Sequence, residues 1–215
     1  MSVELWGAEP PRDCPLCPRL VAYREANRAQ NPDWWNGPAP SFGDPQARLL
    51  VAGLAPGRTG ANRTGRPFTG DAAGWMLYET LIKTGFARGV YKADPNDGLE
   101  LVDCMITNAV RCAPPGNKPE TREENTCRPF LTARLEALPR LKVIVTLGDV
   151  SRRNVLKALG LKASAGRPGH GTEFQAGPYV VLNSYHCSRL NTNTGRLTAE
   201  MFEAVFRRAR ELVDS

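Results

Sequence analysis

Six cysteines are the residues whose types and spacing most directly indicate chemistry in this chain of 215 residues. Cys14 and Cys17 form a CxxC pair, and Cys112 and Cys127 follow much later with 14 residues between them. A CxxC turn brings two thiolates to one centre, and two further thiolates complete a zinc site or an iron–sulfur cluster. The spacing does not separate these two kinds of centre, and four unconnected cysteines are the plainer alternative. The sequence therefore predicts a metal centre held by these four residues.

A second group of candidates lies in a long segment, rich in Gly and Arg, that runs from Gly53 to Asp71. A Walker loop would need Lys and then Ser or Thr after its last glycine, where Arg66 and Pro67 stand instead. The segment is also too long for a dinucleotide-binding fingerprint. Backbone N–H groups and arginines near the start of a helix suit phosphates or an electron-rich ring. The segment therefore indicates a binding surface for such a ligand.

The elements that must position these residues alternate regularly along the chain. Apolar runs predict strands, and amphipathic stretches with capping residues predict helices. The expected strands are 47–53, 101–109, 142–147 and 179–183, and the expected helices are 20–29, 72–84, 120–138, 150–159 and 198–213. This alternation implies a parallel sheet covered on both faces, with ligands bound beyond the carboxyl ends of the strands. Three polar loops leave those ends, at 54–70, 110–119 and 184–197.

Bulk composition narrows the class of protein. Apolar residues make up 41% of the chain, enough for a real core, and no apolar run is long enough to cross a membrane. Residues 1–11 lack the basic and then apolar order of a signal peptide, so we expect a cytoplasmic protein with reduced thiols. The net charge of +6 favours a polyanionic partner, although a basic surface also serves solubility.

Three long motifs, in order, resemble the uracil-DNA glycosylase superfamily. They read GLAPG…NRTGRPFTGD, TNAVRCAPPGNKP and SYHCSRLNTNTGRLT, and CPLCPRL precedes them. The resemblance covers nearly the whole chain and points to family 5 (UDGb), whose members carry a 4Fe-4S cluster. It implies a three-layer α/β/α sandwich around a four-stranded parallel sheet. It also implies one domain over 1–215, with 1–46 a loop-rich arm carrying two of the cluster ligands, Cys14 and Cys17, while Cys112 and Cys127 supply the other two.

The resemblance also implies an activity and its catalytic residues. The expected activity is hydrolytic excision of uracil, and of other deaminated bases such as hypoxanthine, from DNA in base excision repair. Leu54 and Ala55 stand where most of the superfamily has a polar residue that positions water, a departure typical of family 5. The matching roles fall to Asp71, which stabilises the sugar cation or orients water, to Asn117, which holds the water, and to His186, which donates to the departing base. Asp71 can serve equally as a helix cap, and Asn117 as a turn residue.

Further residues are expected to bind the base and the DNA. The base site comprises the backbone and side chains of Gly53, Ala55, Phe68 and Asn108, with Phe68 stacking on the flipped base. The DNA contacts comprise Arg63, Arg66, Arg189, Leu190 and Asn191, with Leu190 wedged into the base stack. We expect a monomer that binds uracil-containing DNA, double or single stranded, and no membrane. The alternative is a metal-stabilised module that binds nucleic acid without chemistry.

Overall fold

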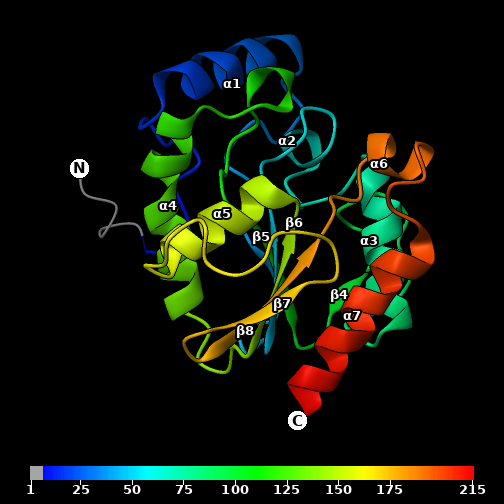
Figure 1. Ribbon diagram of the computed structural model, residues 1–215. Coiled ribbons are helices and arrows are strands. Elements are labelled where there is room, and N and C mark those ends of the chain that lie inside the picture. Colours follow the sequence, from blue (N-terminus) through cyan, green and yellow to red (C-terminus); the bar gives the residue numbers. More distant parts are fainter. Residues whose placement is uncertain (1–6) are drawn as a thin grey trace.

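The computed structural model describes residues 7–215, and its core is one six-stranded sheet in the order β1-β5-β2-β6-β8-β7 (Figure 1). Residues 1–6, the outer end of the expected arm, lie outside the described residues. The four predicted strands are confirmed and run parallel: β2 (Leu49–Gly53), β5 (Cys104–Asn108), β6 (Val143–Leu147) and β8 (Tyr179–Ser184).

The sheet is larger than the four strands expected. Two short strands, β1 (Phe42–Gly43) and β7 (Glu173–Ala176), pair antiparallel at its two edges. The predicted strand 101–109 is also divided, because Asp103 has a positive φ of 55° and interrupts it. Its first part is β4 (Glu100–Leu101), which pairs with β3 (Ala87–Arg88) in a separate two-stranded sheet.

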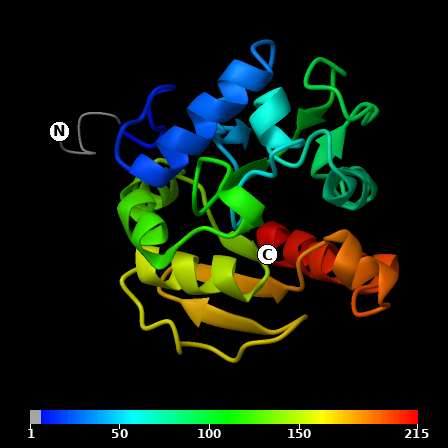
Figure 2. The same ribbon diagram turned by 90° about the horizontal axis from the view of Figure 1, so that it is seen from above.

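Helices cover both faces of the sheet and make three layers, as the predicted sandwich requires. Helices α3 (Ala72–Lys83) and α7 (Ala199–Asp214) cover one face, and α4 (Thr121–Glu136) and α5 (Asp149–Ala158) cover the other (Figure 2). Successive side chains of a strand point to opposite faces. In β2, accordingly, Leu49 and Val51 join the core under α3 and α7, whereas Leu50 and Ala52 join the core under α4 and α5. The central strands are buried on both faces, which explains why they read as unbroken apolar runs.

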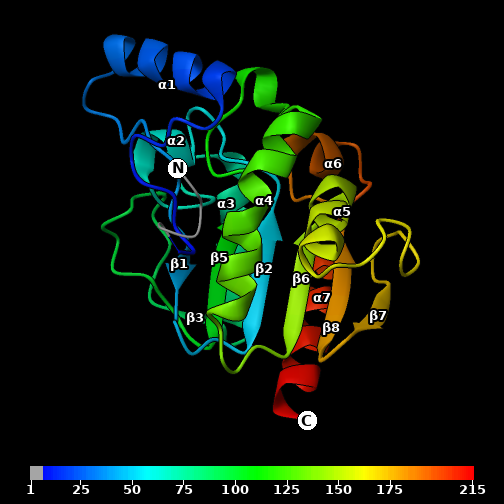
Figure 3. The ribbon, with the colours of Figure 1, turned by 90° about the vertical axis from the view of Figure 1, so that its left-hand side faces the viewer.

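The segment before β2 carries one helix beyond the carboxyl ends of the parallel strands, whereas its strand β1 lies at the edge of the sheet (Figure 3). Its helix α1 (Pro18–Gln30) lies near the short helix α2 (Ala61–Thr64) of the first loop (Figure 3). The Arg58 side chain of that loop donates to Asn27 Oδ1 at 2.6 Å, and Asn62 donates to Asn36 Oδ1 at 3.1 Å. The arm is thereby bonded to the Gly-rich and Arg-rich loop. No helix in the described part of the chain is long and apolar enough to span a membrane.

Candidate active site and cluster site

A cleft of about 750 Å³ opens where the three polar loops meet beyond the strand ends. Its walls come from the loop after β2, the start of α3, the loop after β5 and the loop after β8. Six of the seven residues expected in catalysis and base binding line it, namely Ala55, Phe68, Asp71, Asn108, Asn117 and His186. The fold therefore brings together side chains that lie up to 131 positions apart, since the sequence number rises from 55 to 186.

Asp71 is both a helix cap and a cleft carboxylate. Its Oδ1 accepts from Gly74 N at 3.2 Å, while its Oδ2 lies 3.4 Å from where a Cβ on Gly57 would be. A Cβ on Gly60 would overlap Oδ2, so this glycine leaves room for the carboxylate. Burial raises the pKa of Asp71 above its ordinary value, although the bond from Gly74 and the nearby His186 oppose the shift.

His186 enters the cleft from the loop that follows β8. Burial lowers the pKa of this histidine, and the charge of Asp71 opposes the shift, so the imidazole is neutral at neutral pH. Its ring centroid lies 6.0 Å from that of Phe68. The Asn191 side chain donates to the His186 backbone carbonyl at 2.8 Å, which holds the loop in place. Asn191, expected to contact DNA, also supports the loop that carries His186.

Phe68 and Asn108 line the cleft, and Gly53 lies directly against both of them. Phe68 adopts a positive φ of 52°, and its carbonyl accepts from Tyr91 Oη at 3.0 Å. A Cβ on Gly53 would clash with Asn108 Oδ1 and would lie 2.7 Å from Phe68 Cζ, so only glycine fits beneath the ring. Asn108 Oδ1 is buried and has no hydrogen-bond partner within residues 7–215. An unpaired buried amide is costly, and this one is available to a ligand.

The expected DNA contacts divide into two groups. Arg63, Arg189 and Leu190 are exposed, and both arginines line the cleft, with Leu190 73% exposed beside them in α6 (Arg189–Asn193). Arg66 is only 5% exposed, and it forms a two-pronged ion pair with Asp97 at 2.7 and 2.8 Å. This guanidinium stabilises the loop and is not free to reach DNA, a correction to the expectation.

Trp75 and Arg58 are among the cleft residues to which the sequence assigned no role. Trp75 lies in an amphipathic helix, where an aromatic residue is expected to face the core. Arg58 belongs to the Arg-rich segment that the sequence singled out, but no pattern distinguishes it from Arg66. Their positions follow from the contacts of the arm and of the first turn of α3, which no local pattern encodes.

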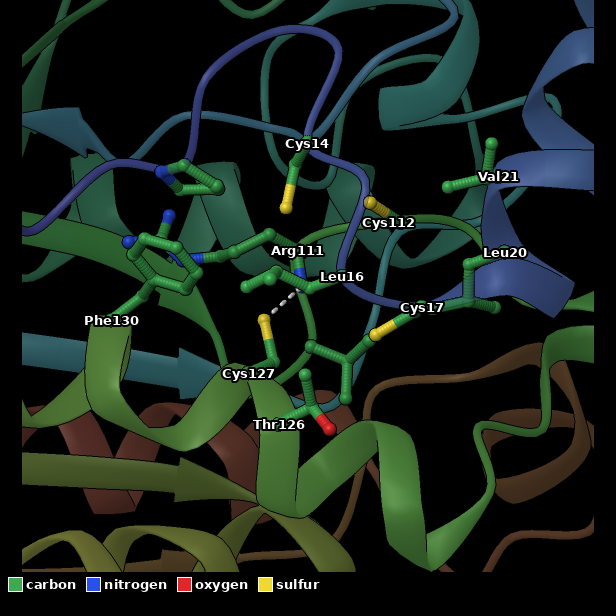
Figure 4. A pocket seen from close by; sticks show the side chains of 12 residues that line it. Cys14, Leu16, Cys17, Leu20, Val21, Arg111, Cys112, Thr126, Cys127 and Phe130 are labelled. Carbon is green, nitrogen blue, oxygen red and sulfur yellow. Dashed lines mark hydrogen bonds between the residues drawn. The ribbon is translucent and has the colours of Figure 1, made fainter. Parts of the chain in front are cut away.

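A second, largely apolar cavity beneath the arm is lined by the four predicted ligands, Cys14, Cys17, Cys112 and Cys127. Cys14 and Cys17 come from the turn before α1, Cys112 from the loop after β5, and Cys127 from α4, and their sulfur atoms point into one space (Figure 4). Apolar side chains complete its wall, including Leu16, Leu20, Val110 and Phe130. Six free thiols are present among the described residues, and no disulfide joins any of these four.

The thiols of this cavity are poorly solvated. Burial raises the pKa values of all four, to about 11 for Cys17 and Cys127, because no water stabilises a bare thiolate there. Two buried arginines partly compensate: Arg24 donates to the Cys14 carbonyl at 3.1 Å, and the backbone N–H of Arg111 lies 3.3 Å from Cys127 Sγ. A cationic group bound among the four sulfur atoms would offset this cost of burying thiolates.

Four thiolates are the donor set of a zinc site or of an iron–sulfur cluster. Within residues 7–215, no set of three or more His, Cys, Asp or Glu side chains lies close enough to bind one metal ion. The four sulfur atoms point into a common space (Figure 4), so the residues present fit an iron–sulfur cluster.

Comparison with known proteins places these two sites in context. The family model described as the uracil DNA glycosylase superfamily matches residues 40–210. The chain is 46% identical over 205 residues to the Type-5 uracil-DNA glycosylase of Thermus thermophilus, covering 93% of each chain. It is 43% identical over 201 residues to the Type-5 enzyme of Pyrobaculum aerophilum, covering 92% of this chain and 88% of the relative. The Type-4 uracil-DNA glycosylase of the same organism is 31% identical over 153 residues, covering 71% and 64%.

Proposed function

The chain belongs to the uracil-DNA glycosylase superfamily, and from this premise we propose that it excises uracil from DNA. The reaction hydrolyses the N-glycosidic bond and leaves an abasic site, the first step of base excision repair. The observation that carries the proposal is the meeting of Asp71, His186 and Phe68, from three separate segments, in one cleft. A target base inside a duplex is out of reach, so the nucleotide has to rotate out of the stack and into this cleft.

Breaking the N-glycosidic bond builds positive charge on the sugar and negative charge on the base. The C1′–N bond breaks with its electron pair passing to the base, and a water oxygen then forms the new bond to C1′ while releasing a proton. Asp71, in its ionised form, stabilises the sugar cation, and Asn117 at the exposed edge of the cleft holds the water. Both side chains line the cleft, which supports this division of labour.

His186 supplies the complementary interaction with the leaving base. A neutral imidazole carries one N–H, and this donor stabilises the base as it becomes an anion. The lowered pKa of His186 supports the neutral form, and the bond from Asn191 to its carbonyl limits the freedom of the loop. Phe68 stacks on the base, and the unpaired Oδ1 of Asn108 accepts a hydrogen bond from its polar edge.

The remaining residues of the cleft grip the DNA. Arg63 and Arg189 contact phosphates, and the exposed Leu190 fills the gap that the rotated nucleotide leaves. These contacts are compatible with single and double strands, and we expect a monomer to suffice because all of the catalytic groups come from one chain. Other deaminated bases such as hypoxanthine are expected substrates, and a cytoplasmic location would keep the thiols reduced.

We also propose that Cys14, Cys17, Cys112 and Cys127 hold a 4Fe-4S cluster. When bound, the cluster supplies iron–sulfur bonds that tie the arm and α4 to the loop after β5. The raised thiol pKa values support this proposal, because a cationic iron core removes the cost of four buried thiolates. Purified protein should be brown and contain about four irons per chain, whereas a colourless protein with one zinc would refute the cluster.

A release assay separates the proposed enzyme from a module that only binds nucleic acid. The protein is incubated with a labelled duplex holding one uracil, and alkali then cleaves the strand at any abasic site. An enzyme converts the uracil strand and leaves the thymine strand intact, while a binding module leaves both intact. A parallel series with hypoxanthine, xanthine and mismatched thymine defines the range of bases.

A further inference from the structure

The indole of Trp75 is an exposed aromatic surface at the mouth of the cleft, and the proposed chemistry gives it no role. Trp75 is 47% exposed and stands one helical turn after Asp71. Three other large apolar side chains are exposed in the described chain, Val90, Val102 and Leu190, and none of them lines the cleft. An exposed tryptophan in a binding cleft indicates a contact with a ligand.

The indole is held in place from behind. Its ring meets that of Tyr91 edge-on, with centroids 5.0 Å apart, and Tyr91 in turn stacks on Tyr78 at 4.6 Å. Tyr91 Oη donates to the Phe68 carbonyl, and the buried guanidinium of Arg66 lies 5.7 Å from the Tyr91 ring. Because these contacts already hold the Trp75 side chain in one position, little side-chain entropy is lost when a ligand stacks on it.

The charges around Trp75 indicate the chemistry of that ligand. Arg58, Arg63 and Arg189 line the same cleft, and Asp71 is its only carboxylate within residues 7–215. A groove that combines cations with an exposed aromatic ring suits single-stranded nucleic acid, whose bases each present a π face. Phe68 is a buried ring on the floor, beside the proposed base site, whereas Trp75 is at the rim. The two rings therefore serve different nucleotides.

We propose that Trp75 is a stacking platform for an unpaired nucleobase adjacent to the excised one. This inference rests on the proposed function, because it takes DNA as the ligand of the cleft. Stacking on Trp75 would hold the neighbouring base away from its own stack, so that single-stranded or locally opened DNA binds more tightly.

The test is binding of the intact, cluster-loaded protein to short single strands that hold one 2′-fluorinated uracil nucleotide, which resists excision. Each nucleotide flanking the uracil is replaced in turn by an abasic analogue. Trp75→Ala should weaken binding about 5- to 100-fold. In the wild type, one abasic position should cost a similar factor, and in Trp75→Ala that position should cost nothing further. Trp75→Phe, which retains a ring, should restore much of the affinity.

The controls separate stacking from charge and from folding. Trp75→Leu keeps apolar bulk without an aromatic face and should bind as weakly as Trp75→Ala, while Val90→Ala, at a 62% exposed site outside the cleft, should bind as the wild type does. The salt dependence of Trp75→Ala should match the wild type, because no phosphate contact is lost. Equal binding by wild type and Trp75→Ala, or losses that add at every position, would overturn the platform. Failure of the wild type to release uracil from unmodified DNA would instead overturn the proposed function.

Discussion

The cysteine cavity and the cleft are both lined by the loop after β5, but they differ in polarity and in the exposure of their charged groups. The loop after β5 sends Cys112 to the cavity and Asn117 to the cleft. Ala55 lines the cleft and packs against the apolar residues around the cysteines. Backbone bonds from Ala109 and Val110 to Gly53 and Leu54, at 3.0 and 2.9 Å, join the loop after β5 to the loop after β2. The cavity and the cleft therefore lie on either side of the same pair of hydrogen-bonded loops.

The difference lies in what the polar groups of each site do. In the cavity the arginines are buried and bonded: Arg111 is 1% exposed and pairs with Glu9 at 3.2 Å, and Arg24 holds a carbonyl. In the cleft Arg63 and Arg189 are exposed, and Asn108 Oδ1 has no partner in the described chain. The polar groups around the cavity form hydrogen bonds and ion pairs that stabilise the fold. The exposed arginines and Asn108 Oδ1 of the cleft are available to a ligand. Changes in the cavity should cost stability, and changes in the cleft should cost activity.

The largest expected effect is the loss of a cluster ligand. Cys112→Ala should lose its iron and its colour and should give little soluble protein. The binding energy of a structural metal centre is of the order of 10 kcal/mol, as large as the whole stability of a typical domain. Iron content, soluble yield and melting temperature provide the measurement. Cys104→Ala is the matched control, because Cys104 is buried in β5 outside the cavity. This variant protein should retain its iron.

The next largest effect should follow from Asp71→Asn. Asparagine caps a helix as well as aspartate does, so the fold is kept while the charge facing the sugar is lost. Excision should slow by about 10²- to 10⁴-fold, with DNA affinity nearly unchanged. Single-turnover kinetics with enzyme in excess provide the measurement. A rate within a few-fold of wild type would leave Asp71 only a cap and make Asn117 the leading candidate for activating water.

Asp71→Asn should also change the pH dependence of the melting temperature, in the opposite direction to its effect on activity. Because the folded-state pKa of Asp71 is raised, this group contributes stability that is fully present below its ordinary pKa of 3.8 and is lost as the pH rises through the folded value. Asp71→Asn should therefore melt at or above the wild-type temperature at pH 7, and the difference should vanish in acid. A lower melting temperature at pH 7 would mean that the carboxylate stabilises the fold.

Much of this contrast could be predicted from local patterns. Unbroken apolar runs indicated the four central strands, and ligand spacing indicated the four cysteines. The division of the arginines could not be predicted, because Arg63 and Arg66 stand in one segment. Arg66 differs through partners outside it, such as Asp97, which lies 31 positions later. The strand β1 is too short to give a pattern, and in β7 exposed Glu173 and Gln175 alternate with less exposed neighbours, without an apolar run. Tertiary contacts decide such cases.

A smaller effect should come from His186→Ala, which removes one donor to the leaving base and should slow excision by about 10²- to 10³-fold. The pH profile makes the role specific. Activity needs ionised Asp71, whose pKa lies above the ordinary 3.8, and neutral His186, whose pKa lies below the ordinary 6.5. The single-turnover rate of the wild type should thus fall in acid, as His186 and Asp71 each take up a proton. In His186→Ala only the limb that belongs to Asp71 should remain, so an unchanged two-step profile would contradict the assignment.

The smallest expected effect belongs to Arg189→Ala, and it tests whether the exposed arginines of the cleft work as cations. Each phosphate contact releases counterions, so the slope of log affinity against log salt should become shallower by about 0.7 on single strands and 0.9 on duplex. Affinity should fall alike for every sequence, because a phosphate contact carries no information about bases. Arg153→Ala is the matched control, since Arg153 is half exposed on α5, pairs with Asp149 and lies outside the cleft. Fluorescence anisotropy over a salt series provides both slopes. If the two variants change the slope equally, the basic charge acts as a diffuse field over the whole surface. The exposed arginines of the cleft would then not differ from other exposed arginines, and only the buried, paired arginines would stand apart.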